Sequence, residues 1–321
     1  MFFFIARRLL QAVGVMLAVG LIAFALFQFV GDPVNNMTGQ DTSLAEREAL
    51  KEELGLNDSV FVQFGRFIGN AARGNFGHSY RQRRPVDELI WERFSATIEL
   101  SAVSALLALL IGIPMGVYTA LKRHSWLSRA FMTLSLIGVS LPTFLIGIFL
   151  ILIFGVTLNW LPTFGRGEVV DVGGWTTGLL TLSGIKSLIL PAVTLAVFQM
   201  TFIVRLVRAE MLEVLRADYI KFAHARGLAA RAVNFGHALK NTLVPVITVI
   251  GLQIGSIVAF AIITESVFQW PGMGLLFIHA IHEVDIPVMA AYLMLIGLLF
   301  VIINLVVDIL YYAIDPRLRL S

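Results

Sequence analysis

Two short patterns come close to known sites of chemistry, but neither meets their requirements. Gly184-Ile185-Lys186-Ser187 has the residue types of a phosphate-binding loop, yet an extra residue separates glycine from lysine. His279 and His282 are three apart, but no glutamate-containing zinc motif accompanies them, so solvated or interfacial histidines are the favoured interpretation. No Ser, His and Asp set can be argued. Any energy source must therefore lie on another chain or in an ion gradient.

Two carboxylates occur within long apolar runs. Glu265 lies near the end of one run and Asp308 near the end of another. Ionisable residues in membrane helices are functional candidates because burying a charge in lipid is costly. Near a span end, however, a side chain can also reach water or headgroups. A partner on a neighbouring helix or in the interface is therefore the favoured expectation for both.

A polar, alanine-rich stretch at 216–227 separates two long apolar runs. Asp218 can cap a helix start, because its side-chain oxygen can accept from the unpaired amides of the first turn. Gly227 suits the C′ position because it adopts positive φ without a Cβ clash. Arg226 suits the negative end of the helix dipole. These residues predict a short helix.

Two interpretations of this short helix stay open. Ala223 and Ala225 leave little side chain, so another surface could approach the backbone closely. The helix would then fit into a partner's groove. Alternatively, the stretch is an ordinary connector between membrane spans.

The composition is that of a membrane protein. Of the 321 residues, 58% are hydrophobic and 14% are charged, whereas soluble proteins carry roughly 25% charged residues. The net charge of +3 is too small to argue for a nucleic-acid partner. The absence of cysteine excludes disulfides, thiolate metal sites and cysteine nucleophiles.

Six apolar stretches are long enough to cross a bilayer, which takes roughly 20 residues in a helix. The first follows Arg7-Arg8 and lacks a small-residue cleavage site, so a retained span is favoured over a signal peptide. Pro114, Pro142 and Pro245 interrupt three of the spans and are expected to make static bends. The stretches are about 9–30, 97–121, 131–156, 188–207, 243–264 and 287–312.

Lysine and arginine gather in the loops of one side, which predicts that this side is cytoplasmic. Both termini and the loop at 209–240 fall on it. The long segment at 31–96 falls outside, with helices expected at 41–56 and 60–72. The outer loop at 157–187 is rich in glycine, and its Trp160 and Trp175 are expected to anchor at the interface.

An ordered series of motifs covers nearly the whole chain. With it, the sequence resembles the permease subunits of ATP-binding-cassette (ABC) importers for dipeptides, oligopeptides, nickel and glutathione. The motifs include Gly31-Asp32-Pro33, Leu54-Gly55-Leu56, Gly74-Asn75-Phe76-Gly77, Arg93-Phe94-Ser95-Ala96-Thr97-Ile98-Glu99-Leu100, Ser140-Leu141-Pro142-Thr143-Phe144, Trp160-Leu161-Pro162, Asp218 to Gly227, Glu265-Ser266-Val267-Phe268, Trp270-Pro271-Gly272-Met273-Gly274 and Asp315-Pro316-Arg317.

The resemblance implies an all-α membrane protein with the type I importer fold, six transmembrane helices and a small external cap. The expected parts are the N-terminus with the first span at 1–30, the cap at 31–96, the transmembrane domain at 97–312 with a coupling loop at 209–240, and a cytoplasmic tail at 313–321.

In that family the short helix is the coupling helix of the EAA loop, which seats in a groove of an ATPase subunit. Gly227 matches the motif's glycine and Ala223 its second alanine, whereas Lys221 and Phe222 replace the glutamate and the first alanine. Any role of the missing glutamate is therefore in doubt. The coupling residues implied are Asp218, Tyr219, Ala223, Ala225, Arg226, Gly227, His237 and Leu239.

The resemblance also implies the partners. They are a second, similar permease, two cytoplasmic ATPases that hold ATP and magnesium, a periplasmic binding protein and the lipid bilayer. The chain would be a transport subunit of a bacterial inner membrane, with no enzyme activity and no cofactor of its own.

Other functions stay open. The same importer class carries nickel or glutathione, and an ion-coupled secondary transporter would work alone. Such a transporter would usually show mid-span carboxylates and inverted repeats, which we do not find in this sequence. A structural or receptor membrane protein would leave the short alanine-rich helix unexplained.

Overall fold

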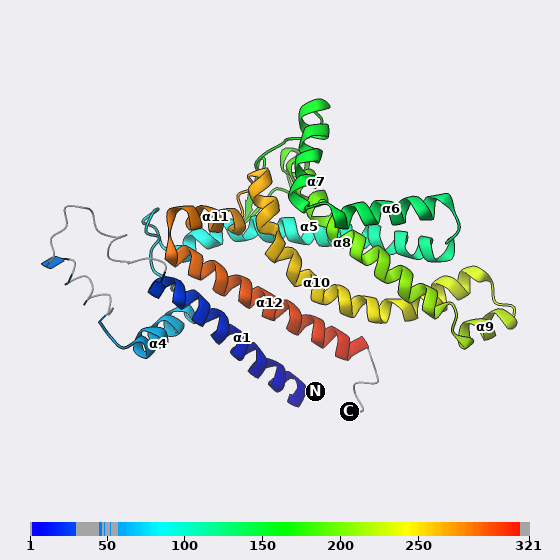
Figure 1. Ribbon diagram of the computed structural model, residues 1–321, viewed down its shortest axis with the longest axis horizontal. Helices are drawn as coiled ribbons and strands as arrows, with labels where there is room; N and C mark the ends of the chain where they lie inside the picture. Colours follow the sequence, from blue (N-terminus) through cyan, green and yellow to red (C-terminus); the bar gives the residue numbers. More distant parts are fainter. Residues whose placement is uncertain (1, 30–44, 47, 49–51, 53–56, 315–321) are drawn as a thin grey trace. The chain divides into compact units, whose positions relative to one another are not determined.

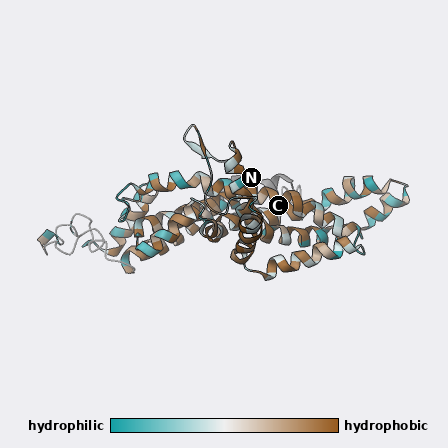
Figure 2. Ribbon diagram, turned by 90° about the horizontal axis from the view of Figure 1, so that it is seen from above, coloured by the Kyte–Doolittle hydropathy of each residue, from teal (hydrophilic) through white to brown (hydrophobic). Residues whose placement is uncertain are grey.

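The computed structural model describes residues 2–29, 45–46, 48, 52 and 57–314 (Figure 1). The helix expected at 41–56 lies largely outside the described residues, as does the tail expected at 313–321. In Figure 2 the helical ribbons are brown, that is hydrophobic, over much of their length. Such a composition is typical of helices that cross a membrane.

The chain divides into two compact units, which are described separately. The first unit contains residues 1–96 and 271–301. The second contains residues 97–270 and 302–321.

The first unit is helical in the residues that the structure describes. Gly20 of its first helix faces Ile68, and Gly297 faces Val19, so small residues let helices approach each other. The helix expected at 60–72 is confirmed, and a turn before Pro85 leads into the next helix. The elements are α1 (Phe2–Phe29), α4 (Val60–Ala71), the start of α5 (Val86–Leu121), α11 (Met273–Glu283) and most of α12 (Ile286–Ile314).

The second unit is arranged around α8, which packs against α6, α7 and α10. Its polar residues Gln199 and Thr201 are buried, and the helix is continuous through them. The elements are the rest of α5, α6 (Trp126–Ser140), α7 (Thr143–Leu150), η1 (Ile151–Thr157), β1 (Val170–Val172), β2 (Trp175–Thr177), α8 (Leu182–Val214), α9 (Asp218–Ala225), η2 (Ala232–Ala238), α10 (Leu239–Phe268) and the end of α12.

The six expected spans correspond to four continuous helices and two bent pairs. The third stretch is not one straight helix, because α6 and α7 with η1 meet at 111° beside Pro142. Proline cannot donate a backbone hydrogen bond, so α6 ends before it. The bend of 53° in the fifth stretch falls between Gly251 and Gly255, beyond Pro245. Counting each bent pair as one span gives six.

The outer loop contains two short strands that were not expected. β1 and β2 pair antiparallel, with Val172 opposite Trp175. The turn between them is Gly173-Gly174, with φ of 64° and 86°. Two consecutive positive φ values define the type I′ turn that suits the twist of a hairpin. The glycines of this loop therefore build a β-hairpin.

Two glycines bring α5 against α8. A Cβ on Gly112 would lie 2.9 Å from Ile203, and one on Gly116 would lie 2.6 Å from the Cβ of Val207. Both distances are shorter than van der Waals contact. Close helix approach through small residues is the main packing device of membrane helices.

Gly116→Leu is expected to destabilise the second unit by about 1–3 kcal/mol, the usual cost of overpacking. Gly14→Leu is the matched control, because a Cβ at Gly14 would meet nothing within 4 Å. Thermal unfolding of the purified chain in detergent would measure both. If Gly116→Leu and Gly14→Leu lowered the Tm equally, α5 and α8 would not be in close contact at Gly116.

Candidate functional site

The short helix predicted in the 216–227 stretch is present as α9. The prediction that Asp218 caps it is wrong, because Ala217 occupies the N-cap and no side chain caps the helix. Asp218 is the first helical residue, and its carboxylate accepts from Lys221 Nζ at 2.8 Å. That hydrogen bond lowers the pKa of the Asp218 carboxyl. The negative charge still suits the helix N-terminus.

Gly227 ends α9 as expected. Its φ is 77°, in the left-handed region. Its N–H donates to the carbonyl of His224 at 2.9 Å, and the N–H of Leu228 donates to that of Ala223 at 3.3 Å. This pair of bonds is a Schellman motif, which satisfies the last carbonyls of a helix.

One face of α9 is anchored to its own chain. Ile220 is 1% exposed and Ala223 is 9% exposed, and both belong to a core that includes Met211 and Val233. Ala223 therefore faces inward and is not part of the surface that a partner would touch. The same core holds the helix in place.

The other face of α9 is open. Phe222 is 64% exposed and Tyr219 is 48% exposed. The Arg226 guanidinium lies 5.9 Å from the Phe222 ring centre, a cation–π arrangement. Ala225 and Gly227 are also exposed. The exposed surface of α9 therefore carries two aromatic rings, Arg226, the ion pair of Asp218 with Lys221, and small residues.

The remaining residues of the predicted coupling set follow α9. His237 is exposed in the π-helical turn η2. Leu239, at the start of α10, packs against the same core as Ala223. Of the predicted residues, Ala223 and Leu239 are thus supporting residues in this structure.

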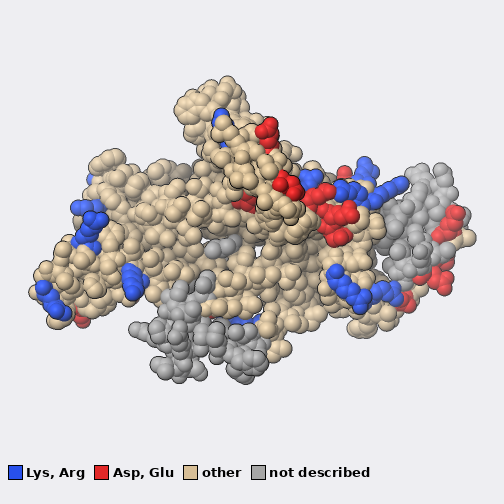
Figure 3. Space-filling view, turned by 180° about the vertical axis from the view of Figure 1, so that it is seen from behind, with Lys and Arg blue, Asp and Glu red and all other residues tan. Residues whose placement is uncertain are grey.

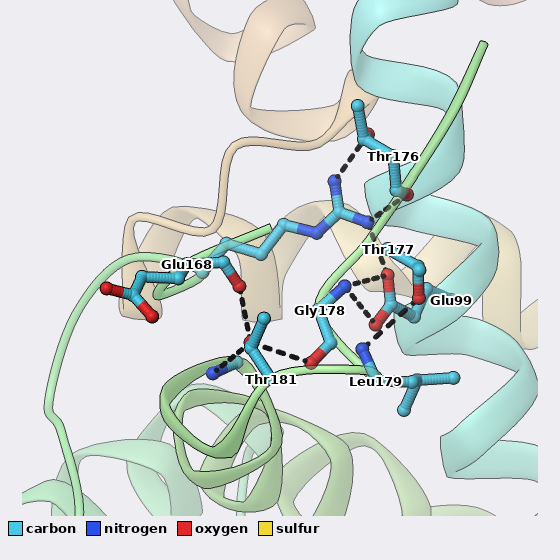
Figure 4. A network of polar contacts seen from close by, with 9 residues as sticks. Glu99, Glu168, Thr176, Thr177, Gly178, Leu179 and Thr181 are labelled. Atoms are coloured by element: carbon cyan, nitrogen blue, oxygen red, sulfur yellow. Dashed lines mark hydrogen bonds and ion pairs between the residues drawn. The ribbon is translucent and has the colours of Figure 1, made fainter. Parts of the chain in front are cut away.

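A buried ion pair was missed by the sequence reasoning. Arg166 of the outer loop pairs with Glu99 of α5, and their side chains are 6% and 2% exposed (Figure 4). Glu99 also accepts from the N–H of Gly178 at 3.1 Å. Arg166 donates to the Thr176 carbonyl at 2.7 Å and to its hydroxyl at 3.1 Å. The network therefore fixes the β-hairpin on the start of the transmembrane part of α5.

Glu265 and Asp308 differ in burial. Glu265 is fully buried and accepts from the Thr97 hydroxyl at 2.6 Å, so the expectation of a partner on a neighbouring helix is confirmed. Asp308 is half-buried. Glu265 thus links α10 to α5 within the second unit.

A third buried carboxylate lies in the first unit. Asp285, 2% exposed, accepts from the Ser79 hydroxyl and from the N–H of Tyr80 at 3.1 Å. Burial, and then the charge of Asp285, raise the pKa of the Tyr80 phenol. Tyr80 is therefore neutral at physiological pH, and the cluster joins the turn before α5 to the start of α12.

The described residues contain no group of three or more His, Cys, Asp or Glu arranged to hold a metal. His279 and His282 are exposed on α11. Gly184 lies in the first turn of α8, where its N–H donates to the N-cap Thr181.

Comparison with known families gives two matches. Residues 112–320 match the family described as the inner membrane component of binding-protein-dependent transport systems. Residues 1–101 match the N-terminal part of such membrane components.

Curated relatives match along almost the full chain. The dipeptide transport system permease protein DppB of Alkalihalophilus pseudofirmus is 39% identical, over 98% of both chains. The di/tripeptide permease protein DppB of Pseudomonas aeruginosa is 41% identical, again over 98% of both. The oligopeptide permease protein AppB of Bacillus subtilis is 38% identical, over 98% of this chain and 99% of AppB.

A solved structure supports the fold. The methionine ABC transporter MetNI, in an inward-facing conformation, aligns with a TM-score of 0.55 and 17% identity. The alignment covers 71% of this chain and 96% of that chain.

Proposed function

Because this chain belongs to the family of inner membrane components of binding-protein-dependent transport systems, we propose that it is the permease subunit of an ATP-driven importer of short peptides. It is a multi-pass membrane transport subunit and not an enzyme. The printed names of its relatives, which handle dipeptides, di/tripeptides and oligopeptides, support the peptide substrate.

Family membership implies association with an ATPase and a binding protein. We assign ATPase contact to the loop at 209–240, and within it to the open face of α9. The observation that carries this assignment is the anchoring of α9, because Ile220 is buried while Tyr219 and Phe222 are exposed. A helix held rigidly on one face and open on the other can transmit force. ATP and magnesium would bind on the partner.

The remaining organisation is proposed from sequence and fold together. A second, similar permease would complete the transport path, and two ATPases would bind below. Both termini and the loop at 209–240 would face the cytoplasm, as the positions of lysine and arginine indicate. The segment at 31–96 would form the external cap before the transmembrane domain at 97–312. The tail at 313–321 would be cytoplasmic.

Uptake by the reconstituted complex tests the substrate. The chain would be co-expressed with its neighbouring transport genes, placed in proteoliposomes with ATP inside, and given a labelled dipeptide with the binding protein outside. We expect ATP-dependent peptide uptake, with unlabelled tripeptide as competitor. Uptake of nickel or glutathione in place of peptide would contradict the peptide assignment. Uptake that follows an ion gradient without ATP would contradict the importer class.

A further inference from the structure

A basic cavity lies beside α9 in the second unit. It has a volume of about 550 Å³, is open to the surface, and is lined by the end of α5, the loop between α5 and α6, the end of α8, α9 and η2. Its lining includes Lys122, Arg123, His124, Arg216 and His224. In Figure 3 the charged atoms at the end of the second unit that carries α9, at the left, are more often blue than red.

None of the described residues that line this cavity carries a carboxylate. Among the residues that the structure describes, Lys122, Arg123 and Arg216 make no ion pair, whereas Asp218 is already paired with Lys221. Arg123 donates a hydrogen bond of 3.0 Å from its Nε to Nε2 of His124. Cations held together without an internal counter-charge repel each other, and an anion between them removes that cost.

A helix terminus adds to the positive potential. Ser125 lines the cavity and is the N-cap of α6, a helix of 15 residues with no acidic residue in its first turn. Its hydroxyl accepts from the N–H of Ser128 at 3.0 Å. Helix N-termini carry a partial positive charge and favour anions.

The residues next to the cavity mark a lipid interface. Trp126 follows Ser125 and is 73% exposed, and tryptophan concentrates at the level of lipid headgroups. Farther along α6, Leu134 and Leu136 are more than half exposed, as lipid-facing side chains are. From the positions of these side chains we infer that the cavity lies near the level of the lipid headgroups.

We propose that this cavity binds a phosphate group, either the headgroup of an acidic phospholipid or a free phosphate. Arg123 and Arg216 would give charge-assisted hydrogen bonds to the phosphate oxygens, and Asn234 can donate another. The bound anion would join the α5–α6 loop to both ends of α9, since Arg216 precedes the helix and His224 lies in its last turn. This inference rests on membrane location and does not depend on the transported substrate.

Retention of lipid by the full-length chain tests the proposal. The chain is purified in detergent, titrated with phosphatidylglycerol or phosphatidylcholine, and analysed by native mass spectrometry. The cavity variant combines Lys122→Gln, Arg123→Gln and Arg216→Gln. The control combines Arg7→Gln, Arg129→Gln and Arg205→Gln, which removes equal charge from exposed residues outside the cavity. We expect the cavity variant to bind phosphatidylglycerol at least about tenfold more weakly, with little change in the control.

Thermal unfolding with inorganic phosphate separates the two sources. A rise in Tm with phosphatidylglycerol alone assigns the site to a lipid headgroup, and a rise with inorganic phosphate as well assigns it to a soluble anion. Whichever ligand raises the Tm of the unsubstituted chain should leave the Tm of the cavity variant unchanged. Equal losses in the cavity and control variants would overturn the proposal, as would no response to either anion. Loss of ATPase co-purification without any anion binding would overturn it too, in favour of a partner carboxylate.

Discussion

Replacing Glu99 with alanine is expected to destabilise the second unit by about 3–5 kcal/mol, because it leaves a buried guanidinium without its counter-charge. The Arg166 side chain is 6% exposed, so water cannot replace the lost carboxylate. The N–H of Gly178 would lose its acceptor as well. Thermal unfolding of the purified chain and proteolysis of the hairpin at 170–177 would measure the effect.

A double replacement separates the charge from the packing. Glu99→Leu combined with Arg166→Met removes both charges, and such apolar exchanges of buried pairs are often neutral or stabilising. We expect the double variant to recover most of the Tm lost in Glu99→Ala. As a surface control, Asp58→Ala removes the carboxylate that pairs with Arg66, both being more than 40% exposed. Exposed pairs contribute only about 0–1 kcal/mol. Equal effects at the two sites would mean that the Glu99 pair is not buried in solution.

The membrane spans could be predicted because each contains roughly 20 apolar residues, whose hydropathies add up to a strong signal. Each long apolar run corresponds to a helix or to a bent pair of helices. The hairpin could not be predicted in this way, since its strands have three residues each and carry no periodic pattern. The pairing of Arg166 with Glu99 joins residues 67 positions apart, which a single sequence does not connect. An ion pair between residues so far apart in the sequence forms only when the outer loop packs against α5.

The existence of α9 could be predicted from Gly227, whose backbone needs a left-handed conformation. Its start was misplaced, because an aspartate can either cap a helix or begin it, and Lys221 three residues on draws its carboxylate away. The prediction that both alanines of α9 face a partner was also only half right. Ala223 and Ala225 look alike in sequence, yet only Ala225 is exposed, because η2 and the end of α8 cover the other face.

The exposed Ala225 is therefore the sharper position for testing contact with an ATPase. Ala225→Trp adds a large side chain at the end of α9 without entering the core, and it leaves the Gly227 backbone unstrained. We expect co-purification of the ATPase to fall by on the order of tenfold or more, since a bulky side chain in a packed interface prevents its closure. Peptide-stimulated ATP hydrolysis by the complex should fall with it.

Ala72→Trp is the matched control, because Ala72 is also an exposed alanine at a helix C-terminus, that of α4 in the first unit. Its Tm and its ATPase recovery should equal those of the unsubstituted chain. Gly227→Trp would combine bulk with backbone strain at φ 77°, whereas Gly227→Asn would add only a small side chain that tolerates this conformation, so it should keep most of the ATPase. If Ala225→Trp keeps the full amount of ATPase, the open face of α9 is not the contact surface. If the unsubstituted chain purifies stably without any ATPase, an ion gradient becomes the energy source to test.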